Sequence, residues 1–171
     1  MNLTEALGLI KEDLAKHRML IDGSLFKLYY MERGFRYCVW MRLSSVSGVI
    51  GIFSKFILHH LQSKFGIQIH ASSKIGGGFY IGHGVGIVIH PRTIIGKNVN
   101  VSQFLTIGSN HNTPAVIGDN VYIGPGVCIV EDVHIGNNVT IGAGSVVTHD
   151  VPDYAVVVGV PAKVIRIKEH K

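Results

Sequence analysis

Cysteine, proline and charge are all scarce in this 171-residue sequence. Two cysteines, Cys38 and Cys128, cannot build a disulfide or zinc framework, which indicates a reducing compartment. Five prolines exclude a collagen-like chain. Charged residues make up 16% of the chain, below the ~25% usual for a soluble domain, so disorder is not expected. The apolar stretch 46–61 is shorter than the ~20 residues that a membrane-spanning helix needs.

Apolar residues make up 47% of the sequence, which is enough to bury the core of one domain. The net charge of +5 comes mainly from residues 1–66, with nine Lys and Arg against five Asp and Glu. Such a surface suits an anionic membrane or ligand, and an ordinary basic solvated face explains it as well. No basic stripe with interleaved aromatic residues is present, so no nucleic-acid partner is expected. The acidic, amphipathic start does not resemble a signal peptide.

From Ile69 to Val147, an isoleucine or valine recurs every six residues, with two interruptions. The positions are Ile69, Ile75, Ile81, Ile87, then Ile89, Ile95, Val101, Ile107, and finally Ile117, Ile123, Ile129, Ile135, Ile141 and Val147. A period of six fits neither an α-helix nor a simple alternating strand. It is typical of a parallel β-helix, in which each hexapeptide forms one short strand and one turn. We therefore predict that these β-branched side chains point inward and stack between coils.

Two interruptions of this repeat carry more information than the regular parts, because insertions in a solenoid form loops. The phase slips by two residues between Ile87 and Ile89, and residues 108–116 form a longer polar excursion that contains His111. Glycine and asparagine at the turns, such as Gly76, Gly96 and Asn98, are expected to adopt positive φ angles.

The first 66 residues show helical spacing instead. Leu3, Leu7, Ile10 and Leu14 predict one helix, and apolar residues between 35 and 61 predict one long helix or two, with a break near Gly48. We expect these helices to pack on the β-helix or on a partner subunit, and an interfacial membrane helix is the alternative. The expected organisation is a helical segment at 1–66, a β-helix at 67–156 and a C-terminal tail at 157–171.

The blocks GIQIHASSKIGGGFYIGHGVGIVIH and VIGDNVYIGPGVCIV, with GVPAKVI near the C-terminus, resemble a known family. They are similar to the left-handed β-helix, or hexapeptide-repeat, acyltransferases, and most of all to serine acetyltransferases and capsule or colanic-acid O-acetyltransferases. The resemblance is dense over residues 67–168. It implies a left-handed β-helix, a homotrimer with active sites between subunits, and acetyl-CoA as the co-substrate.

The resemblance also implies which residues act. His83, in IGHG, matches the histidine that removes a proton from the acceptor hydroxyl. His111 is a second candidate, although the family's loop histidine aligns with Thr113, and Gly108 is a candidate backbone donor to the oxyanion. His70 is interpreted as structural. Histidines such as His59 and His90 have no residues near them in the sequence that would form a catalytic or metal site. No metal site is expected.

For acetyl-CoA, the resemblance points to small residues that let the pantetheine arm approach the backbone and to two cations that meet phosphates. These residues are Gly124, Gly142, Ala143, Gly144, Lys163 and Arg166. Turn geometry alone also explains the glycines, and solvation alone explains the lysine.

The chain departs from serine acetyltransferases at three positions. Gln68 stands where an aspartate orients the catalytic histidine, Gly82 where an aspartate holds the amino group of serine, and Asn112 where an arginine is expected for its carboxylate. Gln68 or a backbone carbonyl remains able to fix the tautomer of His83. These departures favour a neutral hydroxyl acceptor.

We therefore predict an acetyl-CoA-dependent O-acetyltransferase that modifies a saccharide hydroxyl in surface-polysaccharide synthesis. The alternatives are a serine O-acetyltransferase and a non-catalytic β-helix scaffold. The expected assembly is a homotrimer, with a dimer of trimers as an option. The expected location is the cytoplasm, with peripheral contact to the inner membrane surface through the basic N-terminal helices as an option.

Overall fold

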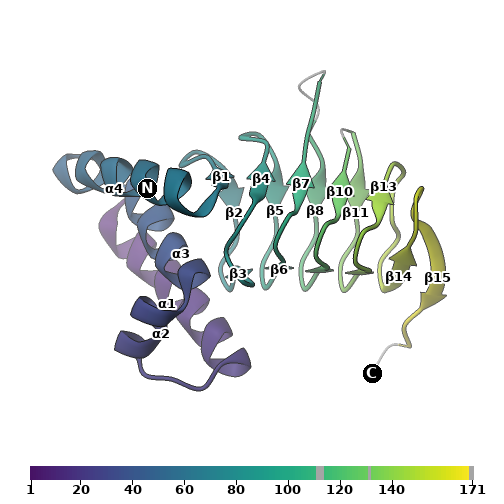
Figure 1. Cartoon of the computed structure of the whole chain (residues 1–171), viewed down its shortest axis with the longest axis horizontal. Helices are drawn as coiled ribbons and strands as arrows, with labels where there is room; N and C mark the ends of the chain where they lie inside the picture. Colours follow the sequence, from purple (N-terminus) through teal and green to yellow (C-terminus); the bar gives the residue numbers. More distant parts are fainter. Residues whose placement is uncertain (111–113, 131, 170–171) are drawn as a thin grey trace.

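The computed structural model describes residues 1–110, 114–130 and 132–169. Four helices come first, and a β-helix extends from them to the C-terminus at the far end of the molecule (Figure 1). The helices are α1 (Leu3–Leu20), α2 (Leu25–Met31), α3 (Arg33–Ser44) and α4 (Val49–Phe65).

From β1 to β13, every third strand of the β-helix stacks on the same sheet, so the coils build three sheets of parallel strands, and β15 adds one antiparallel strand to the last of them. Sheet A contains β1 (Ile67–Ile69), β4 (Ile87–Ile89), β7 (Thr106–Ile107), β10 (Cys128–Ile129) and β13 (Val146–Val147). Sheet B contains β2 (Lys74–Ile75), β5 (Ile94–Ile95), β8 (Val116–Ile117) and β11 (His134–Ile135). Sheet C contains β3 (Tyr80–Ile81), β6 (Asn100–Val101), β9 (Tyr122–Ile123), β12 (Thr140–Ile141), β14 (Ala155–Val158) and β15 (Lys163–Ile167).

The core of the β-helix is the column of β-branched residues that the sequence predicts. All fourteen repeat positions are buried, with exposed fractions between 0 and 7%. Burying each of these side chains is worth about 1.5–3 kcal/mol. The parallel β-helix and its inward-facing residues are therefore confirmed.

The turn residues follow the prediction only in part. Positive φ angles of 57–58° occur at the stacked asparagines Asn98, Asn120 and Asn138. Gly76 and Gly96 do not adopt positive φ, contrary to our expectation. A Cβ on Gly76 would instead lie 2.6 Å from the carbonyl oxygen of Gly96, one coil further along. Glycine is required there because the coils approach closely, not because of the backbone angle.

The two-residue slip of the repeat falls in the turn between β3 and β4. Ile81 pairs with Val101, which is 20 residues later, whereas Ile89 pairs with Ile107, which is 18 residues later. The first coil therefore has two extra residues in this turn, and the turn contains His83.

Side chains of α1 and α3 satisfy the outward-facing backbone groups of the first coil. Asp13 accepts the N–H of Phe79 at 2.8 Å, and Arg42 donates to the carbonyls of Ile75 and Gly76, both at 2.6 Å. Arg42 also forms a buried ion pair with Asp13 at 3.0 Å. Burial raises the pKa of Asp13, and Arg42 opposes that shift.

Tyr37 and Ser45 complete this cap. The hydroxyl of Tyr37 donates to the carbonyl of Ile69 at 3.1 Å and accepts the N–H of the same residue at 3.2 Å. The hydroxyl of Ser45 donates to the carbonyl of Ala71 at 2.6 Å. Because an unpaired buried polar group is costly, the helices protect the open end of the β-helix.

Helices occur in the two predicted regions, as α1 and as α3 with α4, whereas α2 was not predicted, and the buried faces differ from the prediction. α1 buries Ala6, Asp13 and His17, while Leu3 and Leu7 are exposed. Asp13 faces inward because it accepts a backbone N–H of the first coil, whereas Nδ1 of His17 bonds to the carbonyl of Asp13 in its own helix. The sequence pattern contains no sign of those partners.

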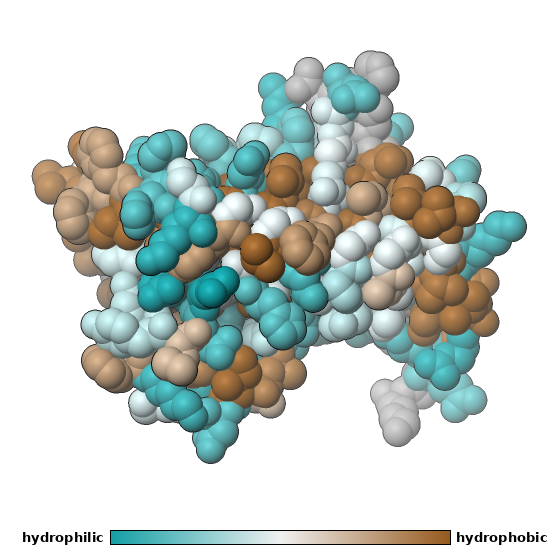
Figure 2. All heavy atoms as spheres, in the orientation of Figure 1, coloured by the Kyte–Doolittle hydropathy of each residue, from teal (hydrophilic) through white to brown (hydrophobic). Residues whose placement is uncertain are grey.

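α4 presents an apolar face to solvent in its first half. Its buried side there consists of Gly51 and Ser54. Val49, Ile50, Ile52, Phe53 and Phe56 are 46–82% exposed, and we call these five residues the α4 patch. Hydrophobic side chains gather at this end of the molecule in Figure 2. α4 thus packs on the β-helix through its second half only.

Candidate functional site

The turns that join sheet C to sheet A form one edge of the β-helix, which we call the C–A edge. His83 lies between β3 and β4, Gly124 between β9 and β10, and residues 142–144 between β12 and β13. The structure therefore brings the predicted general base and the predicted acetyl-CoA glycines to the same edge.

The glycines on this edge differ in what surrounds them. A Cβ on Gly124 would lie 2.8 Å from the backbone nitrogen of Ala143, so coil stacking requires this glycine. A Cβ on Gly142 would lie 2.6 Å from the side chain of Val158. Gly144 has a φ of 68° and open space beside it, because a Cβ added there would have no atom within 4 Å. Of the three predicted acetyl-CoA glycines, only Gly144 has open space where its side chain would be.

Lys163 and Arg166 are exposed residues of β15, the outer strand of sheet C. Lys163 pairs with Val158, whose side chain borders Gly142, so this lysine lies near the C-terminal end of the C–A edge. Lys168 follows β15, and its ammonium group donates to the carbonyl of Asn138 at 2.6 Å. Burial, with the nearby charge of Arg166, lowers the pKa of Lys168. The sequence analysis did not single out Lys168, whose bond to Asn138 places its ammonium group in the turn between β11 and β12, at the opposite edge of sheet C from the C–A edge.

His83 is exposed and has a φ of 60°, a left-handed conformation that is uncommon for a residue with a side chain. Within the described part of the chain, no hydrogen bond to its ring is found. Gln68, which we considered as its orienting partner, lies on β1 and lines a cavity that His83 does not reach. Among the described residues of a single chain, no group therefore orients the ring of His83.

Gly108 follows β7, so it lies at the opposite edge of sheet A from His83. Its N–H donates to the carbonyl of Ile129 at 3.1 Å. This arrangement does not support the predicted role of Gly108 as an oxyanion donor, because the N–H already serves the β-helix ladder. His111, the second candidate base, lies outside the described residues together with Asn112 and Thr113.

A cavity of about 690 Å³ lies on the outer face of sheet A, next to the base of the 108–116 loop. We call it the sheet A cavity. Its lining includes Gln68, His70 and His90 from the β-helix and His59 from α4. Among the described residues that line it, none is Asp, Glu, Lys or Arg. The structure thus brings together three histidines for which the sequence analysis found no common site.

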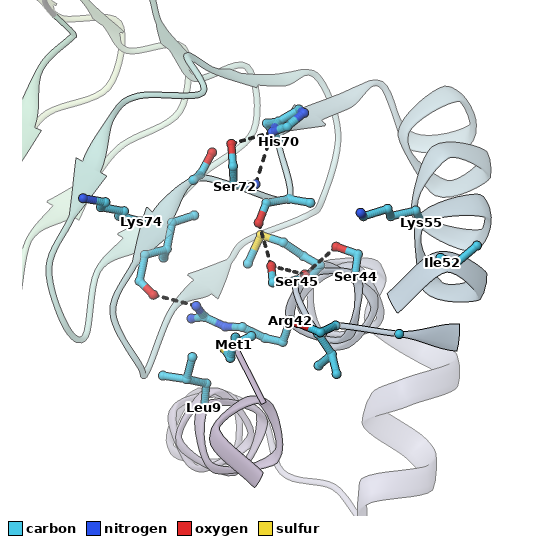
Figure 3. A pocket seen from close by; sticks show the side chains of 17 residues that line it. Met1, Leu9, Arg42, Ser44, Ser45, Ile52, Lys55, His70, Ser72 and Lys74 are labelled. Carbon is cyan, nitrogen blue, oxygen red and sulfur yellow. Dashed lines mark hydrogen bonds between the residues drawn. The ribbon is translucent and has the colours of Figure 1, made fainter. Parts of the chain in front are cut away.

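A second cavity, of about 630 Å³, lies between α1, the junction of α3 and α4, and the first coil (Figure 3). Arg42 and Ser45 point into this region while bonded to the backbone of the β-helix, and His70 lies at its rim. Arg42 and Ser45 are thus engaged in the cap, whereas Lys55 and Lys74 also line the cavity.

Two further observations concern ions and membranes. In the ranges 1–110, 114–130 and 132–169, no three His, Cys, Asp or Glu residues are arranged to hold a metal ion. No helix in the described parts of the chain has both the length and the hydropathy to cross a bilayer.

Three stacked sheets of hexapeptides, with a histidine and small residues along one edge, define a hexapeptide-repeat acyltransferase. Residues 114–149 match the family model described as bacterial transferase hexapeptide (six repeats). The chain is 35% identical over 144 residues to a serine acetyltransferase of Staphylococcus xylosus, covering 72% of this chain and 67% of the relative. It belongs to the serine acetyltransferase family of hexapeptide-repeat acyltransferases.

Solved structures give the same result over nearly the whole chain. The serine acetyltransferase of Neisseria gonorrhoeae superimposes with a TM-score of 0.86 at 28% identity, covering 99% of this chain and 69% of that one. Serine acetyltransferase isoform 3 of Entamoeba histolytica, solved with cysteine, gives 0.80 at 26% identity and covers 97% and 62%. The chain thus spans about two thirds of the length of these relatives.

These similarities test several predictions made from the sequence. The left-handed β-helix with N-terminal helices and the acyltransferase class are confirmed, and family membership implies acetyl-CoA as co-substrate. The relatives are serine acetyltransferases, which favours our alternative acceptor over the saccharide that we preferred. The non-catalytic scaffold finds no support. The predicted roles of individual residues, the trimer and the location are not tested by these similarities.

Proposed function

We propose that this protein transfers the acetyl group of acetyl-CoA to a hydroxyl group, and that the acceptor is serine. The observation that carries the proposal is the C–A edge, where His83, the open space at Gly144 and Lys163 of β15 follow one another along the β-helix. The acceptor is inferred from relatives that match this chain over two thirds of their own length and carry the name serine acetyltransferase.

In the proposed reaction, the Nε2 or Nδ1 atom of His83 takes the proton of the acceptor hydroxyl. The hydroxyl oxygen then forms a bond to the thioester carbon, and the carbon–sulfur bond breaks to release CoA. Acetyl-CoA supplies the activated acetyl group. Gly144 leaves room for a narrow arm beside the backbone, and Lys163 and Arg166 on β15 provide positive charge for phosphates.

A saccharide hydroxyl is the second candidate acceptor, and one observation favours it. Serine carries an ammonium and a carboxylate, which are best bound by opposite charges. Gly82 and Gln68 replace the two carboxylates that the family resemblance implies, and the described lining of the sheet A cavity contains no charged carboxylate or cation. A neutral polyhydroxyl ligand needs no such charges.

We also propose a homotrimer. Within one chain, His83 and the 108–116 loop lie at opposite edges of sheet A, so a second copy is needed to bring a loop to the histidine. A closed threefold arrangement would give three equal sites of this kind.

The location remains a proposal. Cys38 and Cys128 are both free thiols, which suits the cytoplasm. The α4 patch, flanked by Lys55 and Lys64, suits contact with an anionic membrane surface. Sedimentation with vesicles that contain anionic lipid, compared with zwitterionic vesicles, tests that contact.

The activity test measures CoA release as free thiol with L-serine and with a panel of sugars and nucleotide sugars. His83→Ala should lower kcat by ~10²–10⁴-fold, the usual contribution of a general base, and leave the Kd for acetyl-CoA unchanged. Lys163→Ala should raise the Kd for acetyl-CoA and leave kcat nearly unchanged. His134→Ala, at an exposed histidine of sheet B, is the matched control, and His111→Ala should cost much less than His83→Ala.

Near-wild-type turnover of His83→Ala at saturating substrates would refute the proposed mechanism. Preference for a sugar over serine by about tenfold or more in kcat/KM would replace serine by the second candidate.

A further inference from the structure

Two arginines of α3 lie beside the turn that contains His83. Arg33 and Gly34 begin α3, and a Cβ added to Gly84 would lie 3.0 Å from the Cβ of Arg33 and 3.0 Å from the backbone nitrogen of Gly34. Gly84 directly follows His83, and consecutive Cα atoms are only ~3.8 Å apart. The side chain of Arg33 therefore begins next to the proposed general base. The second arginine, Arg36, is one helical turn further along α3.

The end of α4 holds both guanidinium groups near this turn. The guanidinium carbon of Arg33 lies 5.8 Å from the centre of the Phe65 ring, and that of Arg36 lies 5.2 Å from it. The carbonyl of Phe65 accepts the N–H of Gly86 at 3.3 Å, where the His83 turn enters β4. A cation–π contact of this kind positions a guanidinium group without using its N–H donors.

Within the described ranges of the chain, neither guanidinium group has a counter-ion or a hydrogen-bond acceptor. Arg33 is exposed, and the Nε–H of Arg36 is buried without a partner. Glu32, the residue before Arg33, is half-buried and forms no ion pair with either group. Two positive charges held close together repel each other, so an anion bound to both is stabilised there.

We propose that Arg33 and Arg36 bind the carboxylate of the acetyl acceptor, while His83 takes the proton of its hydroxyl. This inference rests on the proposed function and adds the charged groups that recognise the acceptor. A guanidinium fork pairs with a carboxylate through two parallel N–H···O bonds, which fixes orientation as well as affinity. The carboxylate belongs either to serine or to an acidic sugar, and the experiment below distinguishes these sources.

The size of serine suits this position. Three bonds of ~1.5 Å join its hydroxyl oxygen to its carboxyl carbon, so the two groups stay within about 4 Å of each other. A hydroxyl that gives its proton to His83 therefore keeps its carboxylate close to the start of α3. The phosphates of CoA lie beyond the pantetheine arm, away from the thioester. Lys163, at the far end of the C–A edge, matches the phosphates, whereas the arginines of α3 match the acceptor.

This assignment changes the meaning of one departure from serine acetyltransferases. The sequence analysis expected an arginine for the carboxylate of serine at Asn112, and took its absence to favour a neutral acceptor. Arg33 and Arg36 supply cations from α3 instead. A carboxylate acceptor therefore does not require an arginine in the 108–116 loop.

The kinetic test compares Arg33→Gln and Arg33→Lys with Lys97→Gln, which removes one positive charge in the turn between sheets B and C. Arg33→Gln should raise the KM for the carboxylate acceptor about 10–100-fold, because charge-assisted hydrogen bonds are lost. Its kcat should stay within about threefold, and the Kd for acetyl-CoA should not change. Arg33→Lys keeps the charge without the fork and should lie between the two. Lys97→Gln should behave like the wild type.

Arg36→Gln should show the same KM defect as Arg33→Gln. Because the Nε of Arg36 is buried, the melting temperature of this variant is measured beside its kinetics. Arg33 is exposed, so its variants keep the proposal testable even where Arg36→Gln does not fold.

Acceptors without the carboxylate give a readout that a merely structural role would not move. L-serinamide replaces L-serine, and D-glucose replaces D-glucuronate, so each pair keeps hydroxyl groups and loses the negative charge. The wild type should prefer the carboxylate member of one pair by about 10–100-fold in kcat/KM, and Arg33→Gln should reduce that preference to about threefold or less. The pair that responds identifies the source of the carboxylate.

Calorimetric titration of the same four compounds, with CoA present, separates this site from the proposed function. Arg33→Gln should bind the carboxylate compound about tenfold more weakly than the wild type. That result without acetyl transfer by the wild type would refute the function and keep the site. Acetyl transfer with an unchanged acceptor KM in Arg33→Gln, equal use of both members of each pair, or no binding of either carboxylate compound would refute the site.

Discussion

Removal of a single hydroxyl group tests whether the helices cap the β-helix. In Tyr37→Phe the ring keeps its shape, but the N–H of Ile69 loses its only described acceptor in a fully buried position. The carbonyl of Ile69 keeps the side-chain amide of Gln62, at 3.1 Å. Leaving one buried donor unpaired costs ~1–3 kcal/mol, so we expect a loss of about 2 kcal/mol. For a chain of this length, that lowers Tm by about 4–8 °C.

The pH dependence of the same variant provides a second measurement. Burial raises the pKa of Tyr37 to about 12, above the ordinary value of 10. The folded protein thus favours the neutral phenol. This preference stabilises the fold fully below pH 10, and the stabilisation is lost as the pH rises from 10 to about 12. The two-unit difference corresponds to about 2.7 kcal/mol. Tyr37→Phe should lack this alkaline loss.

The assay is equilibrium urea unfolding followed by circular dichroism, at one fixed protein concentration because assembly contributes to stability. Tyr30→Phe is the matched control, since Tyr30 is 58% exposed, and it should stay within about 0.5 kcal/mol of the wild type. If Tyr37→Phe were as stable as Tyr30→Phe, the hydroxyl would not cap the first coil, and our account of the helical segment would be wrong.

Three other outcomes are expected. Burial lowers the pKa of His17 in the folded protein, so neutral His17 stabilises the fold fully above the unfolded pKa of about 6.5. This stabilisation is lost as the pH falls below that value. In His17→Phe, the free energy of unfolding should therefore depend less on pH in the acid range. Gly34→Ala places a Cβ against the carbonyl oxygen of Ile81 and should lower the free energy of unfolding in urea by more than about 2 kcal/mol. Gly8 lies in α1 with open space beside it, so Gly8→Ala should raise the free energy of unfolding by about 0.5–1 kcal/mol. Light scattering should give three times the chain mass, and a stable monomer that binds acetyl-CoA would contradict the trimer.

The β-helix was predictable because its signal is periodic and local. Each hexapeptide buries its own β-branched residue, so the fourteen positions are visible in the sequence without knowledge of the partner coil. The two extra residues that lengthen the His83 turn are visible for the same reason, because they interrupt the six-residue spacing of the repeat.

The helical cap and the sheet A cavity were not predictable in this way. Asp13 and Arg42 resemble ordinary helix-surface residues in the sequence, because their partners are backbone groups far along the chain. His70 and His90 did leave a signal, the repeated Ile-His pair twenty residues apart, but its meaning depends on the coil length that brings the two rings together.

The last strand has a consequence for how these molecules meet end to end. β15 runs antiparallel to β14, with a register shift between Val156 and Val157, whereas the other pairings between neighbouring strands are parallel. In a solenoid whose final coil stayed parallel, the last coil would expose a row of backbone groups with which the last coil of another copy could pair, whereas the first coil is already covered by α1 and α3. The reversed strand, with Lys163 and Arg166 on it, interrupts that row. A chain that ends before β15 should therefore form end-to-end dimers through its last coils, and the full chain should not.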